Sequence, residues 1–147
     1  MVPKAYSVET WLAHLLAHSH AGRPAPNVRL HAPGDETRLA LEDGERLVAA
    51  VTSEAGREYL LTCRRLVAGG ATLCRYDEVA RCGWEPTAPR AGRDQVVVRY
   101  AFRLVLELAD GCRVELEGLG HAAHPLNRFF ASVAGEIATP RVVSERK

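Results

Sequence analysis

The feature that most constrains the fold is a run of strict alternation, QVVVRYAFRLVLELADGCRVELEG, at residues 95–118. Every second residue from Val96 to Leu108 is apolar, while Arg99, Arg103 and Glu107 lie between them. Such alternation predicts a β-strand with one face on a core and the other in solvent. We therefore expect a half-buried sheet whose apolar face another part of the chain must cover.

The turn inside this run fixes how its two strands pair. A two-residue loop would set Leu108 opposite Arg113 and mix the apolar and charged faces. A three-residue loop at 109–111, with Gly111 in the left-handed conformation, sets Leu108 opposite Cys112 and places Cys112 on the core face. The same register predicts these pairs, including two ion pairs: Leu106 with Val114, Leu104 with Leu116, Glu107 with Arg113, and Arg103 with Glu117.

Four more strands are predicted before this hairpin. Short turns at 54–56 and 68–70 favour antiparallel pairing between neighbours, because short connections cannot cross a sheet. A turn-rich stretch at 85–94 separates these strands from the hairpin, and we expect it to be mobile. The predicted strands are Glu45–Ser53, Arg57–Val67, Ala71–Tyr76 and Glu78–Trp84.

An amphipathic helix is predicted at each end of the chain. The first runs from Val8 to about Ser19 with Ser7 as N-cap, and its apolar stripe is Trp11, Leu12, Leu15 and Leu16. In the second, Pro125 suits the first helical position and Pro140 follows the end. Burying its stripe contributes on the order of 10 kcal/mol before entropy is subtracted, so this helix must dock on the sheet. That stripe is Leu126, Phe129, Phe130, Val133 and Ile137.

The segment between the first helix and the strands predicts a linker. Residues 21–38 contain three prolines and two glycines, with room for a short strand at 28–31. We therefore divide the chain into an N-terminal helix and linker, residues 1–40, and a main domain, residues 41–147.

Charge and hydropathy exclude some classes of partner. Nineteen basic and eighteen acidic residues nearly cancel, so no global field favours nucleic acid or an anionic bilayer. No segment approaches the roughly 18 apolar residues of a transmembrane helix, and the N-terminal apolar run is too short for a secretory signal. These features predict a cytoplasmic protein without a membrane span.

The four cysteines lack the spacing of a zinc site. Ten, seven and twenty-nine residues separate Cys63, Cys74, Cys82 and Cys112, so no C-x2-C pair exists to begin one. In a cytoplasm we expect reduced thiols that pack as small hydrophobes. The sequence thus predicts no metal and no cofactor.

Three segments resemble bacterial members of the pleckstrin-homology-like (PH-like) superfamily: GERLVAAVTSEAGREYLLTCRRLV at 44–67, CRYDEVARCGW at 74–84 and LELADGCRVELEG at 106–118. The resemblance covers residues 41–137 and leaves the first helix outside. The residues that carry it are Gly44, Glu45, Leu61, Thr62, Arg64, Arg65, Leu66, Tyr76, Val79, Gly111 and Val114.

The resemblance implies an α+β, mainly β fold. It would be a strongly bent antiparallel sheet or partly open barrel, capped by the C-terminal helix and extended by the N-terminal one. It also implies a non-enzymatic interaction module that binds a protein partner or itself. Two alternatives stay open: a lipid or small-ligand binder at the open barrel end, and a metalloprotein or enzyme that uses the histidines.

Candidate site residues follow from these alternatives. The apolar stripe of the first helix has two possible roles. It is part of the core if it docks on its own domain, and otherwise it is an interaction surface for a partner or a second copy. Its residues are Trp11, Leu12, Leu15 and Leu16. His14 and His18 are four apart on a helix and could share a metal. No third ligand at supporting spacing completes that set, so a structural or surface role is favoured.

The remaining candidates are weaker. Catalysis by Cys63 with His121 would require the fold to bring them together. Arg64 and Arg65 should point to opposite strand faces and so cannot clamp one anion together. Phosphoinositide binding is disfavoured, because the first hairpin loop, TSEAGRE, has Arg57 as its only basic residue.

Overall fold

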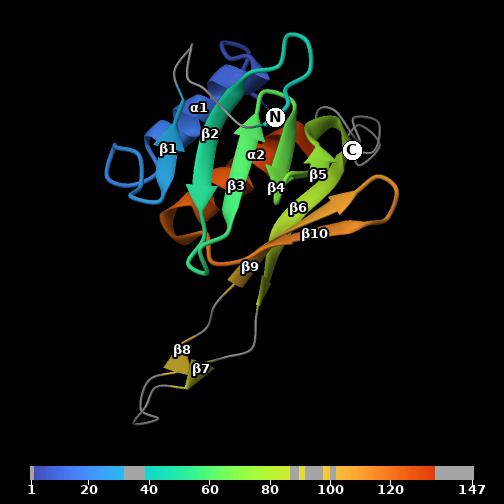
Figure 1. Ribbon diagram of the computed structural model, residues 1–147. Helices are drawn as coiled ribbons and strands as arrows, with labels where there is room; N and C mark the ends of the chain where they lie inside the picture. The colour runs from blue at the N-terminus through green and yellow to red at the C-terminus, as the bar shows by residue number, and fades with distance from the viewer. Residues whose placement is uncertain (1, 32–38, 87–89, 92–97, 100–101, 135–147) are drawn as a thin grey trace.

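The computed structural model describes residues 2–31, 39–86, 90–91, 98–99 and 102–134. It is an α+β fold, mainly strands, in which two antiparallel sheets are accompanied by two helices (Figure 1). Within the described residues neither sheet closes into a barrel. The five-stranded sheet follows chain order: β1 (Val28–Leu30), β2 (Leu47–Thr52), β3 (Glu58–Thr62), β4 (Arg65–Ala68) and β5 (Ala71–Arg75).

The second sheet has the order β10-β9-β6. Its strands are β6 (Val79–Pro86), β9 (Phe102–Leu108) and β10 (Arg113–Leu116), and a short 3-10 turn, η1 (Tyr76–Glu78), leads into it from β5. A separate two-stranded ribbon joins β7 (Arg90–Ala91) and β8 (Val98–Arg99). The apolar residues Val96, Val98 and Tyr100, and most of the stretch at 85–94 that we expected to be mobile, fall outside the residues whose side chains are described.

The predicted register of the β9–β10 hairpin is confirmed. Leu106 lies opposite Val114 and Leu104 opposite Leu116, while the Leu108 N–H donates to the Cys112 carbonyl. Gly111 has a φ of 93°, which is the left-handed conformation that a three-residue loop requires. The Arg103–Glu117 ion pair also forms, at 3.2 Å.

Three details of the hairpin were predicted wrongly. Cys112 is exposed, and Phe102, at the other end of β9, is 55% exposed. Phe102 is the first residue of β9 and Cys112 directly precedes β10, so both lie where the hairpin strands end and the alternation no longer predicts burial. Glu107 does lie opposite Arg113 as predicted, but its carboxylate forms its ion pair with Arg81, because β6 also lies beside β9 and brings a competing arginine.

The predicted strand Arg57–Val67 is in fact two strands, β3 and β4, joined by a tight turn at Cys63 and Arg64. The Thr62 hydroxyl stabilises this turn by accepting the backbone N–H groups of Arg64 and Arg65. Such a side-chain bond lets a threonine compete with the sheet ladder. No glycine or proline marks the turn, so the sequence pattern gave no warning of it.

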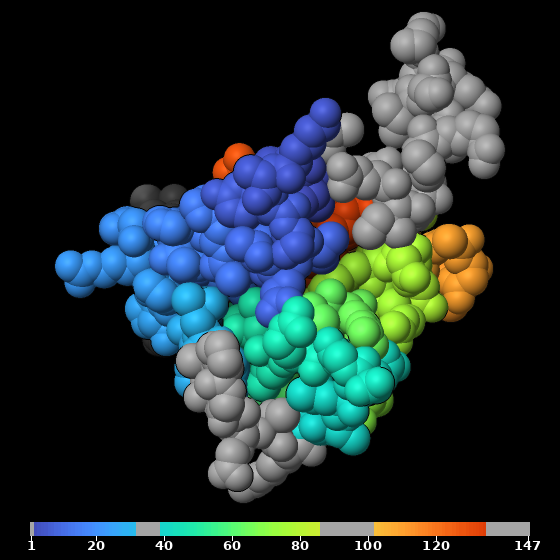
Figure 2. All heavy atoms as spheres, turned by 90° about the horizontal axis from the view of Figure 1, so that it is seen from above, coloured from blue at the N-terminus to red at the C-terminus, as the bar shows by residue number. Residues whose placement is uncertain are grey.

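The N-terminal helix α1 (Val8–Ala17) begins as predicted, with Ser7 accepting the backbone N–H of Thr10. It packs against the C-terminal helix α2 and the sheet edge at β1 and β2. Figure 2 shows the N-terminal segment, in dark blue, spread over one face with small orange and red areas of the C-terminal segment beside it. Residues on both sides of the predicted boundary at 40 therefore share one hydrophobic core.

Helix α2 (Ala123–Val133) supplies the centre of that core. Phe129 and Phe130 are fully buried, and the ring of Tyr76 meets both edge-on, with centroids 5.0 and 5.9 Å away. A second 3-10 turn, η2 (Gly120–Ala122), precedes the helix, so Pro125 is the third helical residue and not the first. Ile137 and Pro140 lie outside the described residues. Neither helix has the length and apolarity to cross a membrane, nor does any other helix in the described ranges.

Candidate functional site

Several of the residues that carry the family resemblance meet in one network, centred on the buried Glu45, at the start of β2 and the β3–β4 turn. The Glu45 side chain accepts hydrogen bonds from the Thr62 hydroxyl at 2.6 Å and from Arg65 Nε at 2.8 Å. The Tyr76 hydroxyl donates to the Thr62 carbonyl at 2.7 Å. Gly44, with a φ of 77°, lies so close to Arg64 that a Cβ would be 3.1 Å from its Nη2.

The electrostatics of this network are those of a satisfied buried charge. Burial raises the pKa of Glu45, but the hydrogen bonds from Arg65, Thr62 and the Glu42 backbone outweigh it and lower the pKa from 4.5 to about 2. Glu45 is therefore ionised at neutral pH, and Arg65 and Thr62 both donate to it. These contacts indicate a structural role for the motif.

Arg64 and Arg65 bind different groups, although Arg64 lies in the β3–β4 turn and not on a strand as predicted. Arg65 pairs with Glu45, while Arg64 pairs with the exposed Glu42 at 3.3 Å. Arg75 binds the same Glu42 carboxylate at 3.0 Å.

The cysteines do not form a reactive group among the described residues. Burial raises the pKa of Cys74 and of Cys82 to about 12, and a hydrogen bond with Asp110 raises the pKa of Cys112. Because the thiolate is the nucleophile, these raised pKa values keep the three thiols protonated and unactivated at neutral pH. Only Cys74 is fully buried; Cys63 and Cys82 are half-buried, so the prediction of core packing holds best for Cys74.

The predicted interaction stripe lies in the core of its own chain. Trp11 and Leu15 are 5% and 6% exposed, and Leu12 and Leu16 are fully buried. The sequence left open whether this stripe docks on its own domain or on another chain. In the structure it docks on its own domain. The Trp11 indole N–H donates to the Ser132 hydroxyl of α2 at 3.3 Å, and Arg128 lies over the Trp11 ring at 5.2 Å.

The histidines form two contacting pairs. The rings of His14 and His18 are 4.6 Å apart between centroids, and Nδ1 of His18 is 2.8 Å from the His14 carbonyl oxygen. His20 and His121, from opposite ends of the chain, have ring centroids 4.0 Å apart. This second pair was missed, since nothing in the sequence relates the linker to the start of α2. In the described ranges no three His, Cys, Asp or Glu side chains group as metal ligands would.

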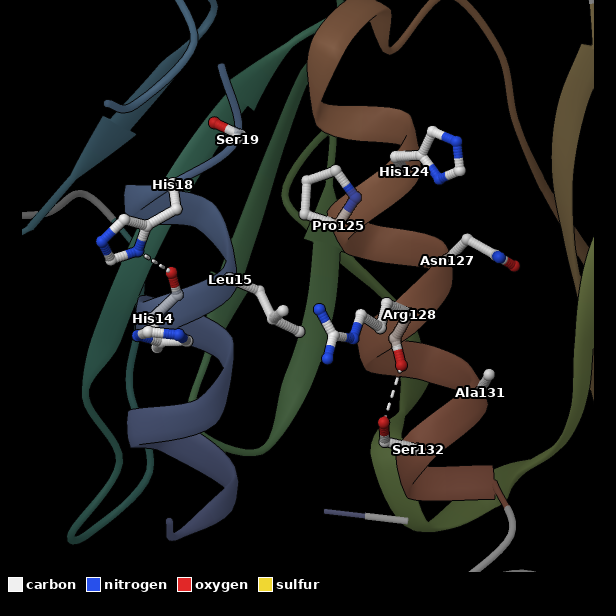
Figure 3. Close-up of a pocket in the computed structure, with 10 residues that line it drawn as sticks. All are labelled: His14, Leu15, His18, Ser19, His124, Pro125, Asn127, Arg128, Ala131 and Ser132. Carbon is white, nitrogen blue, oxygen red and sulfur yellow. Dashed lines mark hydrogen bonds between the residues drawn. The ribbon is translucent and has the colours of Figure 1, made fainter. Parts of the chain in front are cut away.

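A groove of about 650 Å³ runs between the two helices, and we call it the α1–α2 groove. Figure 3 shows His14 and His18 along one side of α1, and Arg128 reaching from α2 toward Leu15 of α1. No acidic side chain lines this groove within the described residues. The full lining is His14, Leu15, His18, Ser19, His124, Pro125, Asn127, Arg128, Ala131 and Ser132.

A second candidate surface is the free edge of β6. This strand pairs with β9 along one side, and no strand pairs with its other side in the described part of the chain. Trp84 on β6 is 41% exposed, and its ring meets His124 edge-on. Because Trp84 lies opposite Leu104 and Phe102 is two residues from Leu104, the two exposed aromatic residues are diagonal neighbours on one face. Helical and strand periodicity alone could not reveal their exposure.

Comparison with known proteins finds no match from which further information about this chain could be taken. No protein-family model matches the chain, and neither a curated protein nor a solved structure matches it. The resemblance to PH-like proteins therefore stays a prediction from the sequence motifs.

Proposed function

We propose that this chain is a non-enzymatic PH-like interaction module that binds a protein strand, from a partner or from a second copy, along the edge of β6. The order of motifs supports the PH-like assignment, as do the two antiparallel sheets and the C-terminal helix docked on them. The raised thiol pKa values and the satisfied Glu45 network favour binding over catalysis.

The exposed edge of β6 is the observation that carries this proposal. A strand with one unpaired edge offers a row of backbone N–H and C=O groups that another strand can pair with. β6 is eight residues long, more than a protected edge usually has. Trp84 and Phe102 add apolar area beside it, and exposed aromatic residues are enriched at protein interfaces.

A lipid or small ligand between the sheets is less well supported. The Phe129 and Phe130 side chains fill the core there and are fully buried. In the β2–β3 loop the one basic side chain, Arg57, lies over the ring of Tyr59 at 5.2 Å. We retain the cytoplasmic location as part of the proposal, because all four cysteines are free.

Two measurements test the proposal. Analytical ultracentrifugation from 5 to 500 µM should show self-association, or selection from a displayed random-peptide library should yield peptides that bind. In either case Trp84→Ser combined with Phe102→Ser should weaken binding at least tenfold. Leu41→Ser is the matched control, because Leu41 is also an exposed large hydrophobic residue, at 37%, but lies away from β6.

A monomer at every concentration that also selects no peptide would contradict the proposal. Equal losses in the double variant and in Leu41→Ser would show that general surface stickiness, and not the β6 edge, causes association.

A further inference from the structure

Gly83, in the middle of β6, is a glycine that the fold itself does not require. The other glycines in the described part of the chain all have a positive φ, which favours glycine, but Gly83 does not. A Cβ at Gly83 would have nothing within 4 Å, so close packing does not exclude a side chain either. Glycine inside a strand is unfavourable, because it loses conformational freedom on folding and packs no side chain. A second backbone that approaches β6 closely would explain this residue.

A hollow of about 290 Å³ lies beside Gly83. Its lining is residues 81–85 of β6 together with Val105 and Glu107 of β9. Val105 lies directly opposite Gly83 and is only 6% exposed. Consecutive strand residues point to opposite faces, so a hollow lined by five of them in a row also reaches the β6 backbone. The missing side chain thus leaves a hollow, with Val105 in its wall, next to the free edge of β6.

A strand that pairs with the free edge of β6 would bring its own side chains alongside this hollow. The side chain opposite Gly83 would point to the same face of the sheet as Val105. A large ring at that position can lean across the glycine and fill the hollow, because aromatic residues compensate for glycine across a strand pair. An alanine at the same position would leave the hollow empty.

Arg81 defines the direction of the added strand. It lies two residues from Gly83 on the same face, and its side chain is 78% exposed. Nε and Nη2 of Arg81 donate to Glu107, so Nη1 keeps its N–H groups for an acidic side chain on the added strand. Opposite charges on paired strands stabilise the pairing. On the other side of Gly83, Glu85 already accepts hydrogen bonds from two arginines, so a basic partner residue gains little there.

We propose that the strand bound at the β6 edge belongs to a partner protein, runs antiparallel to β6, and carries an aromatic residue opposite Gly83 and an acid opposite Arg81. This inference rests on the proposed function and names the chemistry of its partner. Antiparallel pairing is the more stable direction, and every strand pair in the described ranges uses it. The acid then follows the aromatic residue by two positions. A second copy of β6 centred on Gly83 would set glycine opposite glycine and leave the hollow empty, so a different chain fits better.

Titration of isotope-labelled protein with two synthetic peptides, followed by NMR, tests the inference. The first peptide is Thr-Thr-Val-Phe-Val-Glu-Thr with blocked ends, and the second has alanine in place of phenylalanine. Wild-type protein should bind the phenylalanine peptide at least fivefold more tightly, with the largest shifts in β6. Gly83→Thr fills the hollow and should reduce this ratio below twofold. Arg81→Glu should invert the preference at the acidic position, so that a peptide with lysine there binds more tightly.

Ala71→Thr is the matched control, because Ala71 is an exposed small residue at the start of β5, in the other sheet. The fivefold ratio should persist in this variant. Thermal unfolding checks that the variants are folded, and Gly83→Thr should be at least as stable as wild type because its Cβ meets nothing within 4 Å. Equal affinity of wild type for the two peptides, or the same ratio in Gly83→Thr and wild type, would overturn the inference.

The outcomes separate this inference from the proposed function. If both peptides bind equally, and the double variant Trp84→Ser with Phe102→Ser loses that binding, the inference is wrong while β6 remains the binding edge. If neither peptide binds while the chain self-associates, the edge serves a second copy and the inference is again wrong. The proposed function itself fails only when the chain neither self-associates nor selects any peptide.

Discussion

The indole N–H of Trp11 on α1 donates to the Ser132 hydroxyl on α2, and this bond joins the first helix of the chain to the last. The Ser132 hydroxyl in turn donates to the Arg128 carbonyl at 2.7 Å. Trp11 is 5% exposed, so the polar edge of a buried aromatic ring is satisfied by the partner helix. The N-terminal helix is thus held to the main domain by specific contacts as well as by apolar packing.

Substitutions at Trp11 should separate these two contributions. Trp11→Phe keeps most of the buried ring and removes the donor, so we expect a loss of about 1 kcal/mol in unfolding free energy. Trp11→Ala also leaves a cavity between the helices and should cost about 3–5 kcal/mol. Urea denaturation followed by circular dichroism measures both. Ala131→Ser, at an exposed position of α2, serves as control and should lie within about 0.5 kcal/mol of wild type. Equal stability of Trp11→Ala and the control would mean that α1 does not dock.

Glu45→Gln should be strongly destabilising at neutral pH. Removing one partner of a buried ion pair leaves Arg65 with an uncompensated charge, at a cost of about 3 kcal/mol. Glu42→Gln is the matched control, because Glu42 also pairs with arginine, in its case Arg64 and Arg75, but is exposed, so its substitution should cost clearly less stability. Chemical denaturation at pH 7 compares them. If the two variants lose equal stability, burial is not what makes the motif glutamate important.

The same carboxylate should give the protein an acid-sensitive stability. The pKa of Glu45 is lowered from 4.5 to about 2 in the folded chain. A depressed folded-state pKa contributes stability that is fully present above pH 4.5 and is lost as the pH falls toward 2. That contribution is on the order of 3 kcal/mol. Denaturation midpoints from pH 6 to pH 2 should therefore fall more steeply for wild type than for Glu45→Gln, and parallel curves would refute the assignment.

Periodicity predicted those features of the fold that depend on one face of an element. The β9–β10 register followed from matching Leu104, Leu106 and Leu108 with their partners, because a one-residue slip would have inverted both faces. The Ser7 cap and the α1 stripe followed from helical spacing in the same way. These features are local, so a single stretch of chain contains the information.

The features that the sequence could not predict are those that join distant segments. Arg113 was assigned to Glu107 because β6 could not be placed beside β9 from the sequence, and Arg113 in fact reaches Glu85 of β6. The His20–His121 contact likewise depends on the linker and the start of α2 meeting in space. The β3–β4 turn escaped detection for a different reason, since a threonine side chain stabilises it without glycine or proline.

Gly44 and Gly111 should respond differently to alanine, although both have positive φ. At Gly44 a Cβ would lie 3.1 Å from the Arg64 guanidinium, whereas at Gly111 nothing lies within 4 Å. Gly111→Ala should therefore cost only the backbone strain of about 1–2 kcal/mol. Gly44→Ala should cost more, because the Arg64 guanidinium must also move by a few tenths of an ångström to make room for the Cβ. Thermal unfolding with matched denaturant titrations gives the comparison, and a smaller loss at Gly44 would show that Arg64 moves freely.

Thiol accessibility tests the largest error of the sequence-based prediction, the placement of Cys112. Because Cys112 is exposed while Cys74 is buried and Cys82 half-buried, a bulky disulfide reagent at pH 8 should modify Cys112 well before those two. Asp110 raises the pKa of the Cys112 thiol, so Asp110→Asn should lower that pKa and speed the reaction several-fold. Mass spectrometry of peptides after timed quenching assigns each site, and Cys112→Ser should remove the Asp110-dependent reaction. If Cys112 instead reacts as slowly as Cys74, its side chain faces the core as the alternation had indicated.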